Sequence, residues 1–139
     1  MKIPVRVKTH SVIKSVGDTE SYVTSSVGEG EMEYTEALAS FDYRTADEGE
    51  ELITRISASA ECVRLKMRGT TQADLYFRRG AEYDTVYGVG GFSFDAHVVA
   101  EAPIVRITER GGEIRLRYTM NLGGDERAAT VLVSVYRLD

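Results

Sequence analysis

The chain has very little cysteine and histidine. Its 139 residues include one cysteine, Cys62, and two histidines, His10 and His97. A single cysteine cannot close an internal disulfide, and no cluster of Cys and His has the spacing of a zinc site. The sequence therefore predicts a protein kept in a reducing compartment, with the cytoplasm as the expected location. It predicts no metal site and no cofactor.

A basic surplus and long apolar runs are missing as well. Lys and Arg total 17 against 22 Asp and Glu, which gives a net charge of −5, whereas proteins that bind phosphate backbones need a basic surplus. No run approaches the roughly 18 apolar residues of a membrane helix, and residues 1–20 lack the apolar core of a signal peptide. We therefore expect neither a nucleic-acid partner nor a membrane partner.

What the chain has in abundance is the alternation of polar and apolar side chains. In residues 113–122 this alternation is unbroken, and it places on one face Ile114, Leu116, Tyr118, Met120 and Leu122. A period of two residues is typical of a strand in a sheet with one dry side. Gly111-Gly112, just before this segment, is predicted to form a tight hairpin turn.

Similar segments follow one another along the chain, separated by glycine-rich turns and once by Pro103. We count about nine or ten short strands, and Gly28-Glu29-Gly30 predicts a bend in the second of them. Residues 52–60 fit either a strand or an amphipathic helix, and both alternatives stay open. The pattern predicts one all-β domain over residues 1–139, built as an antiparallel up-and-down barrel or as a sandwich, with at most one short helix.

Several stretches carry a resemblance to a known family. They are Arg68-Gly69, Leu75–Gly80, Gly91–Phe94, Gly112–Met120 and Val133–Tyr136. In order and spacing they resemble the YwiB-like family of small uncharacterised bacterial proteins, chiefly from Firmicutes. The resemblance implies a calycin-like, lipocalin-type antiparallel β-barrel of roughly eight to ten strands. It implies no reaction, ligand or catalytic residue.

A barrel of this size is either filled by its own side chains or holds one small ligand. Tyrosine offers an apolar ring and a hydroxyl group, as small-molecule sites require, although it also simply suits strands. The candidate ligand-binding residues are Tyr34, Tyr43, Tyr118, Met120 and Arg68. Tyr118 is the first choice, because it shares the inward face with Met120. Arg68 ends a strand beside a glycine, where a ligand carboxylate would enter, but such basic residues more often pair with carboxylates on a solvated face.

No catalytic motif is present. Cys62 has no histidine base near it in the sequence and is expected to be a small buried side chain. His97 is expected to be a hydrogen-bonded structural residue rather than a haem ligand. We therefore expect a non-enzymatic protein that binds a small, partly apolar ligand inside its barrel. The alternative is a structural or interaction protein that uses its outer face or a strand edge to bind a protein partner or to form a homodimer. An enzyme that uses Arg68 and a carboxylate ranks last.

Overall fold

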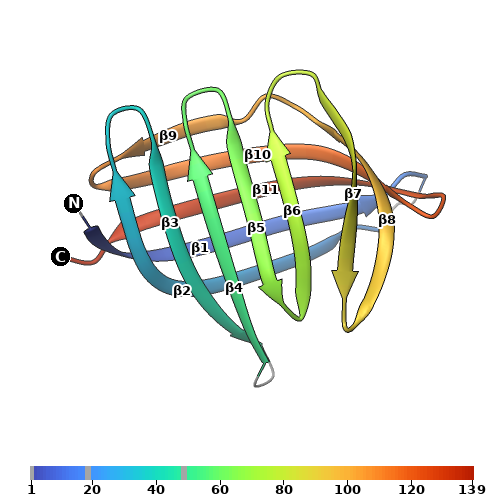
Figure 1. The fold of residues 1–139 in the computed structure, drawn as a ribbon, viewed down its shortest axis with the longest axis horizontal. Coiled ribbons are helices and arrows are strands. Elements are labelled where there is room, and N and C mark those ends of the chain that lie inside the picture. Colours follow the sequence, from blue (N-terminus) through green and yellow to red (C-terminus); the bar gives the residue numbers. More distant parts are fainter. Residues whose placement is uncertain (1, 18–19, 48–49) are drawn as a thin grey trace.

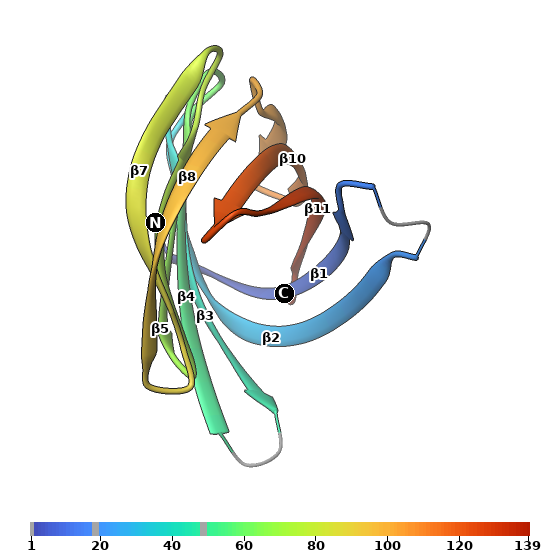
Figure 2. The ribbon, with the colours of Figure 1, turned by 90° about the vertical axis from the view of Figure 1, so that its right-hand side faces the viewer.

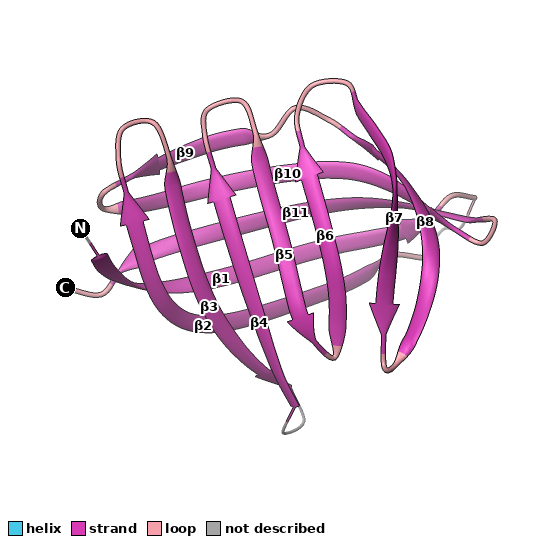
Figure 3. Cartoon of the chain, viewed as in Figure 1, coloured by secondary structure: helices cyan, strands magenta, loops and turns pink. Residues whose placement is uncertain are grey.

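The computed structural model describes residues 2–17, 20–47 and 50–139, and in these ranges the chain forms strands and turns without a helix (Figures 1 and 3). The strands are β1 (Lys2–Ser15), β2 (Tyr22–Tyr34), β3 (Ala39–Asp47), β4 (Glu50–Ala58), β5 (Val63–Gly69), β6 (Thr71–Phe77), β7 (Ala81–Val89), β8 (Phe92–Ala100), β9 (Ile104–Thr108), β10 (Gly111–Leu122) and β11 (Asp125–Arg137). For residues 52–60 the sequence allowed a strand or a helix, and the structure has a strand, since β4 covers most of them. In these ranges no segment has the helical length and hydropathy needed to cross a membrane.

The strands close into an antiparallel barrel, which confirms the predicted all-β barrel fold (Figures 1 and 2). Neighbouring strands follow the order β11-β1-β2-β3-β4-β5-β6-β7-β8-β10, and β10 pairs back with β11 to complete the ring. The wall therefore contains ten strands. It follows the chain as an up-and-down meander except at β9.

Strand β9 lies beside only half of β10. Residues 111–115 of β10 pair with β9, whereas residues 118–122 pair with β8. Pro103 lies in the segment between β8 and β9, as the sequence predicted. Because proline has no N–H to donate to a ladder, the wall is interrupted there before it resumes as β9.

The prediction of a tight turn at Gly111-Gly112 misses the observed turn by two residues. The turn is formed by Glu109 and Arg110, and both glycines belong to β10. Their φ angles are +107° and +145°, and a Cβ at either position would collide with a backbone carbonyl, that of Val135 or of Arg106. This glycine pair therefore marks a close approach of three strands rather than the turn itself.

Alternate residues of every strand face the barrel interior. The inward face predicted for β10 is confirmed, since Ile114 and Leu116 are completely buried and Met120 nearly so. Near the β2–β3, β4–β5 and β6–β7 turns the interior is packed with buried side chains. They include Met32, Ala39, Phe41, Ile56, Ala58, Val63, Leu75, Phe77 and Ala81. This half of the barrel forms the hydrophobic core.

Candidate ligand-binding cavity

The opposite half of the barrel is hollow. It contains a cavity of about 550 Å³, lined by side chains from β1 to β7 and from β10 and β11. This volume lies within the range of about 300 to 1,000 Å³ that is typical of small-molecule sites. The cavity opens at the end of the barrel where β1, β3, β5 and β7 end, which is the end away from the packed core.

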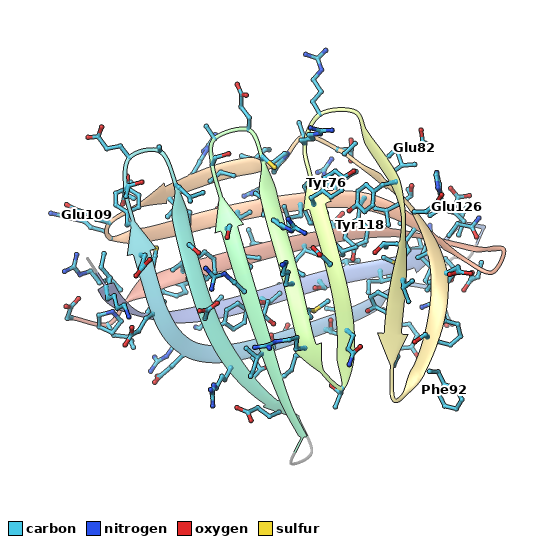
Figure 4. The ribbon with its side chains drawn as sticks, viewed as in Figure 1. Tyr76, Glu82, Phe92, Glu109, Tyr118 and Glu126 are labelled. Atoms are coloured by element: carbon cyan, nitrogen blue, oxygen red, sulfur yellow. The ribbon has the colours of Figure 1, made fainter. Side chains whose placement is uncertain are left out.

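Exposed side chains on the inward face of β8 indicate that the described side chains leave this end partly uncovered. Ala96 and Val98 are buried on that face, but Phe94, two residues before Ala96, is 47% exposed. Phe94 lies opposite Tyr87, which lines the cavity. At the tip of the same hairpin Phe92 is 71% exposed (Figure 4). Apolar side chains on an inward face stay exposed only where no opposing side chains cover them.

Hydroxyl groups form one wall of the cavity. They come from the inward faces of β1 to β4 and belong to Thr9, Ser11, Thr24, Ser26, Tyr43, Thr45 and Thr54. The Thr9 Oγ1 and Tyr43 Oη atoms lie 3.3 Å apart in a hydrogen bond. Burial raises the pKa of Tyr43, while its hydrogen bonds to Thr9 and Thr54 act in the opposite direction. This part of the wall is thus a small internal hydrogen-bond network.

Aromatic and aliphatic side chains form the other wall. They come from β5, β6, β7, β10 and β11 and include Leu65, Leu75, Phe77, Tyr87, Leu116, Tyr118, Val131 and Val133. The rings of Phe77 and Tyr118 meet edge to face with their centroids 5.4 Å apart. Tyr118, labelled in Figure 4, thus packs against Phe77 and also lines the cavity.

The Tyr118 hydroxyl has no hydrogen-bond partner among the described residues. Burial raises the pKa of Tyr118 to about 12, and neither a side chain nor the backbone donates a hydrogen bond that would oppose this. Every fully enclosed polar side-chain atom in the described ranges does have a partner. The unpaired hydroxyl is therefore not sealed in the core but borders the cavity, where a ligand could reach it.

Charged side chains are absent from the described residues that line the cavity. Burial raises the pKa of Tyr87 in the aromatic wall, and the nearby charge of Arg127 acts in the opposite direction. The Nε atom of Arg127 already donates a hydrogen bond of 2.9 Å to Asp125. Arg127 is therefore half-exposed and hydrogen bonded to Asp125 at this end of the barrel.

The mouth of the cavity lies beside a segment where β2 and β3 are no longer paired. Residues 22–28 of β2 pair with β1, but only residues 29–34 of β2 pair with β3 as well. A Cβ at Gly28 or Gly30 would collide with backbone carbonyls of β3, so the two strands approach closely just before they diverge. The bend predicted at these glycines is where β2 leaves β3 and curves around the barrel (Figure 2).

The residues predicted as ligand-binding lie in four different places. Tyr43 and Tyr118 line the cavity together. Met120 is buried on the inward face beside Tyr118, and Tyr34 packs against the core at the other end of the barrel. Arg68 is exposed on the outer face, where it borders a separate open groove with Arg55 and Lys66.

The hydroxyl wall was not among the sequence predictions. Its signal was present, since Thr9, Ser11, Thr24 and Ser26 occupy the inward parity of the first two strands. A run of small hydroxyl side chains at positions that would otherwise carry core residues marks a part of the barrel that is not packed.

Two further predictions concern Cys62 and His97. The prediction that Cys62 is buried is wrong: the side chain is exposed in the β4–β5 turn, where its backbone N–H donates to Ser59 Oγ. His97 lies on the outer face of β8 and contacts Asp84 and Glu82. No group of three or more Cys, His, Asp or Glu within the described ranges could hold a metal ion.

Comparison with known proteins identifies relatives by fold and family. A family model described as a domain of unknown function, DUF1934, matches residues 6–133. The crystal structure of the YwiB protein from Bacillus subtilis superimposes with a TM-score of 0.79, at 16% sequence identity, and the match covers 99% of this chain and 94% of that chain. No curated protein matches the chain. The predicted resemblance to YwiB-like proteins is therefore confirmed, and at this identity the structural match shows the fold alone.

Proposed function

This chain belongs to the DUF1934 family, and we propose that its barrel binds one small, partly apolar molecule in the cavity. The observation that carries the proposal is the unpaired Tyr118 hydroxyl at the edge of a cavity of about 550 Å³. Because this hydroxyl borders the cavity and is not sealed in the core, a hydrogen-bonding group of a ligand could reach it.

The arrangement of the interior supports the same proposal. The packed half of the barrel holds the wall rigid, and the hollow half exposes inward side chains such as Phe94. Covering apolar surface stabilises a complex by about 25 cal/mol per Å² removed from water. Calycin-like barrels also bind ligands inside a closed sheet, as we propose for this chain. We place the protein in the cytoplasm, because its one cysteine has no partner for a disulfide.

The proposal is tested by filling the cavity. Ser11 is half-buried and lines it, so Ser11→Phe places a ring in the space that a ligand would occupy. Ser134 is equally half-buried on the outer face of β11, and Ser134→Phe is the matched control. Native mass spectrometry of freshly purified protein should show a bound small molecule in the wild type and in Ser134→Phe, and much less in Ser11→Phe.

A fluorescence titration with the neutral dye N-phenylnaphthylamine gives a second measurement that does not depend on a co-purified molecule. We expect the wild type and Ser134→Phe to bind the dye, and Ser11→Phe to bind at least tenfold more weakly, equivalent to about 1.4 kcal/mol. Equal dye binding by all three folded proteins would show that the cavity is not the site.

One observation favours a second function, association with another copy of this chain. In the described ranges, residues 22–28 of β2 have a backbone partner on one side only. Tyr22, Val23 and Val27 on this segment are 79%, 58% and 56% exposed. An apolar strand edge without charged side chains is a template for pairing with another strand.

A further inference from the structure

The cavity also specifies the chemistry of its occupant. We infer that the ligand is an uncharged amphiphile, with an apolar body and a hydroxyl or carbonyl group that hydrogen bonds to Tyr118. This inference rests on the proposed function and narrows it, because a small, partly apolar ligand could equally have been a fatty acid, an amine or a phosphate ester.

The first argument is the absence of charge. Among the described residues that line the cavity, all are Ser, Thr, Tyr, Phe or aliphatic residues including Met. Transfer of an ionised carboxylate or ammonium group from water into such surroundings is very unfavourable unless an opposite charge accompanies it. Arg127, the cation that acts on Tyr87, is not one of the lining residues and hydrogen bonds to Asp125. The basic side chains Arg55, Lys66 and Arg68 border the outer groove instead.

The second argument concerns what the hydroxyl of Tyr118 can do. Because the pKa of Tyr118 is raised to about 12, its phenol stays protonated over the physiological range. A neutral phenol donates one hydrogen bond and accepts another, which suits a carbonyl or hydroxyl group. Such a hydrogen bond favours a ligand that carries a carbonyl or hydroxyl group over one that has none.

The third argument is that hydroxyl groups predominate on one side of the cavity and apolar groups on the other, although Ile13 and Leu52 lie on the first side and Thr71 on the second. Hydroxyl groups of Thr9, Ser11 and Thr54 lie on one side, and the rings and aliphatic chains of Phe77, Leu116 and Val131 lie on the other. The deepest lining residues, among them Leu75 and Phe77, are buried and apolar, whereas Thr24 and Ser26 near the mouth are exposed. An amphiphile would therefore enter with its apolar body first, which leaves its polar group toward the mouth.

The test compares three molecules that have the same ten-carbon chain and differ in their polar group: decanol, decanoate and decylammonium. Each is titrated into a complex of the wild type with N-phenylnaphthylamine, and displacement of the dye gives its affinity. We expect decanol to bind at least tenfold more tightly than either ion, because only the ions must be desolvated as charges.

A tyrosine substitution tests the hydrogen bond. Tyr118→Phe removes only the hydroxyl group and should weaken decanol binding about threefold to tenfold, which corresponds to one net hydrogen bond. Tyr136 is 49% exposed on the outer face, so Tyr136→Phe is the control and should leave decanol binding unchanged. Thermal unfolding of both variants confirms that they fold.

The outcomes separate this inference from the proposed function. If decanoate or decylammonium binds as tightly as decanol, the inference is wrong while binding in the barrel stands. If Tyr118→Phe binds decanol as well as the wild type does, Tyr118 is not the hydrogen-bond partner, and the inference is wrong. If neither the dye nor any of the three molecules binds the wild type, both the proposed function and the inference fall.

Discussion

At the scale of single residues, His97 is held between two carboxylates on the outer face of the barrel. Its Nδ1 atom lies 2.8 Å from Asp84 Oδ1, and its Nε2 atom lies 2.9 Å from Glu82 Oε1. Both partners belong to β7, and β8 places His97 directly opposite Asp84. The hydrogen bond to Asp84 first, and that to Glu82 second, favour the protonated ring and raise the pKa of His97 above its usual value.

This pKa shift predicts a pH dependence of stability. The pKa of His97 is higher in the folded chain than in the unfolded chain, so the folded chain binds the extra proton more strongly. The stabilisation is complete below the unfolded pKa of about 6.5, and it is lost as the pH rises through the raised folded value. Thermal unfolding of the wild type and of His97→Gln should therefore differ more at about pH 6 than at about pH 9. An equal difference at both pH values would contradict the prediction.

At the scale of elements, the weakest seam of the wall lies between β6 and β7. Backbone pairing there is limited to Thr71 with Val89 and Gln72 with Gly88. Beyond these pairs a side chain takes the place of the missing strand partner: the Tyr83 hydroxyl accepts from the Tyr76 N–H at 2.8 Å and donates to the Tyr76 carbonyl at 2.9 Å. The two tyrosine rings also stack with centroids 3.9 Å apart.

Removal of this hydroxyl should loosen the seam. Tyr83→Phe keeps the stacked ring but leaves the Tyr76 N–H and carbonyl without partners, at an expected cost of about 1 to 3 kcal/mol in the free energy of unfolding. Urea unfolding measures this cost, and amide hydrogen exchange at Tyr76 should become faster. Tyr22→Phe, at a side chain that is 79% exposed, is the control and should change neither quantity. Unchanged exchange at Tyr76 in Tyr83→Phe would show that the hydroxyl does not hold the seam.

Sequence reasoning could predict the fold at this scale because two-residue alternation reports directly which face of a strand is buried. The faces of β10 and the interruption at Pro103 were predicted in this way and are confirmed. The position of the β9–β10 turn was predicted wrongly, because Gly111 and Gly112 are required by the close approach of neighbouring strands and not by the turn. A close approach between strands far apart in the chain leaves the same glycines in the sequence as a local turn does.

The candidate site could be predicted only in part, for a different physical reason. Alternation places Tyr43 and Tyr118 inside the barrel, but it does not report at which height along the axis the interior is packed. Tyr34 also has inward parity, yet it packs against the core at the filled end. Arg68 ends its strand beside a glycine, but its parity directs it outward. Strand tilt and register decide these heights, and both depend on pairings between strands.

At the scale of the whole molecule, the barrel combines a packed end with an open end. The open end has both the cavity mouth and the unpaired edge of β2, because the same divergence of β2 from β3 produces both. Ligand binding and association with a second copy would therefore occur at adjacent surfaces. If a second copy paired along this edge, it would lie across Thr24 and Ser26 at the mouth.

Association through the β2 edge predicts a defined change in molecular mass. With a chain mass of 15.4 kDa, light scattering coupled to size exclusion should give about twice this value for the wild type. Val23→Lys places a charge on the exposed edge and should return the chain to the monomer, because strands with an edge lysine resist pairing. Val99→Lys, at an outer-face position of β8 that is 42% exposed, is the matched control and should leave the mass unchanged. A wild-type chain that stays monomeric at high concentration would rule out self-association through this edge, and the open end would then serve the ligand alone.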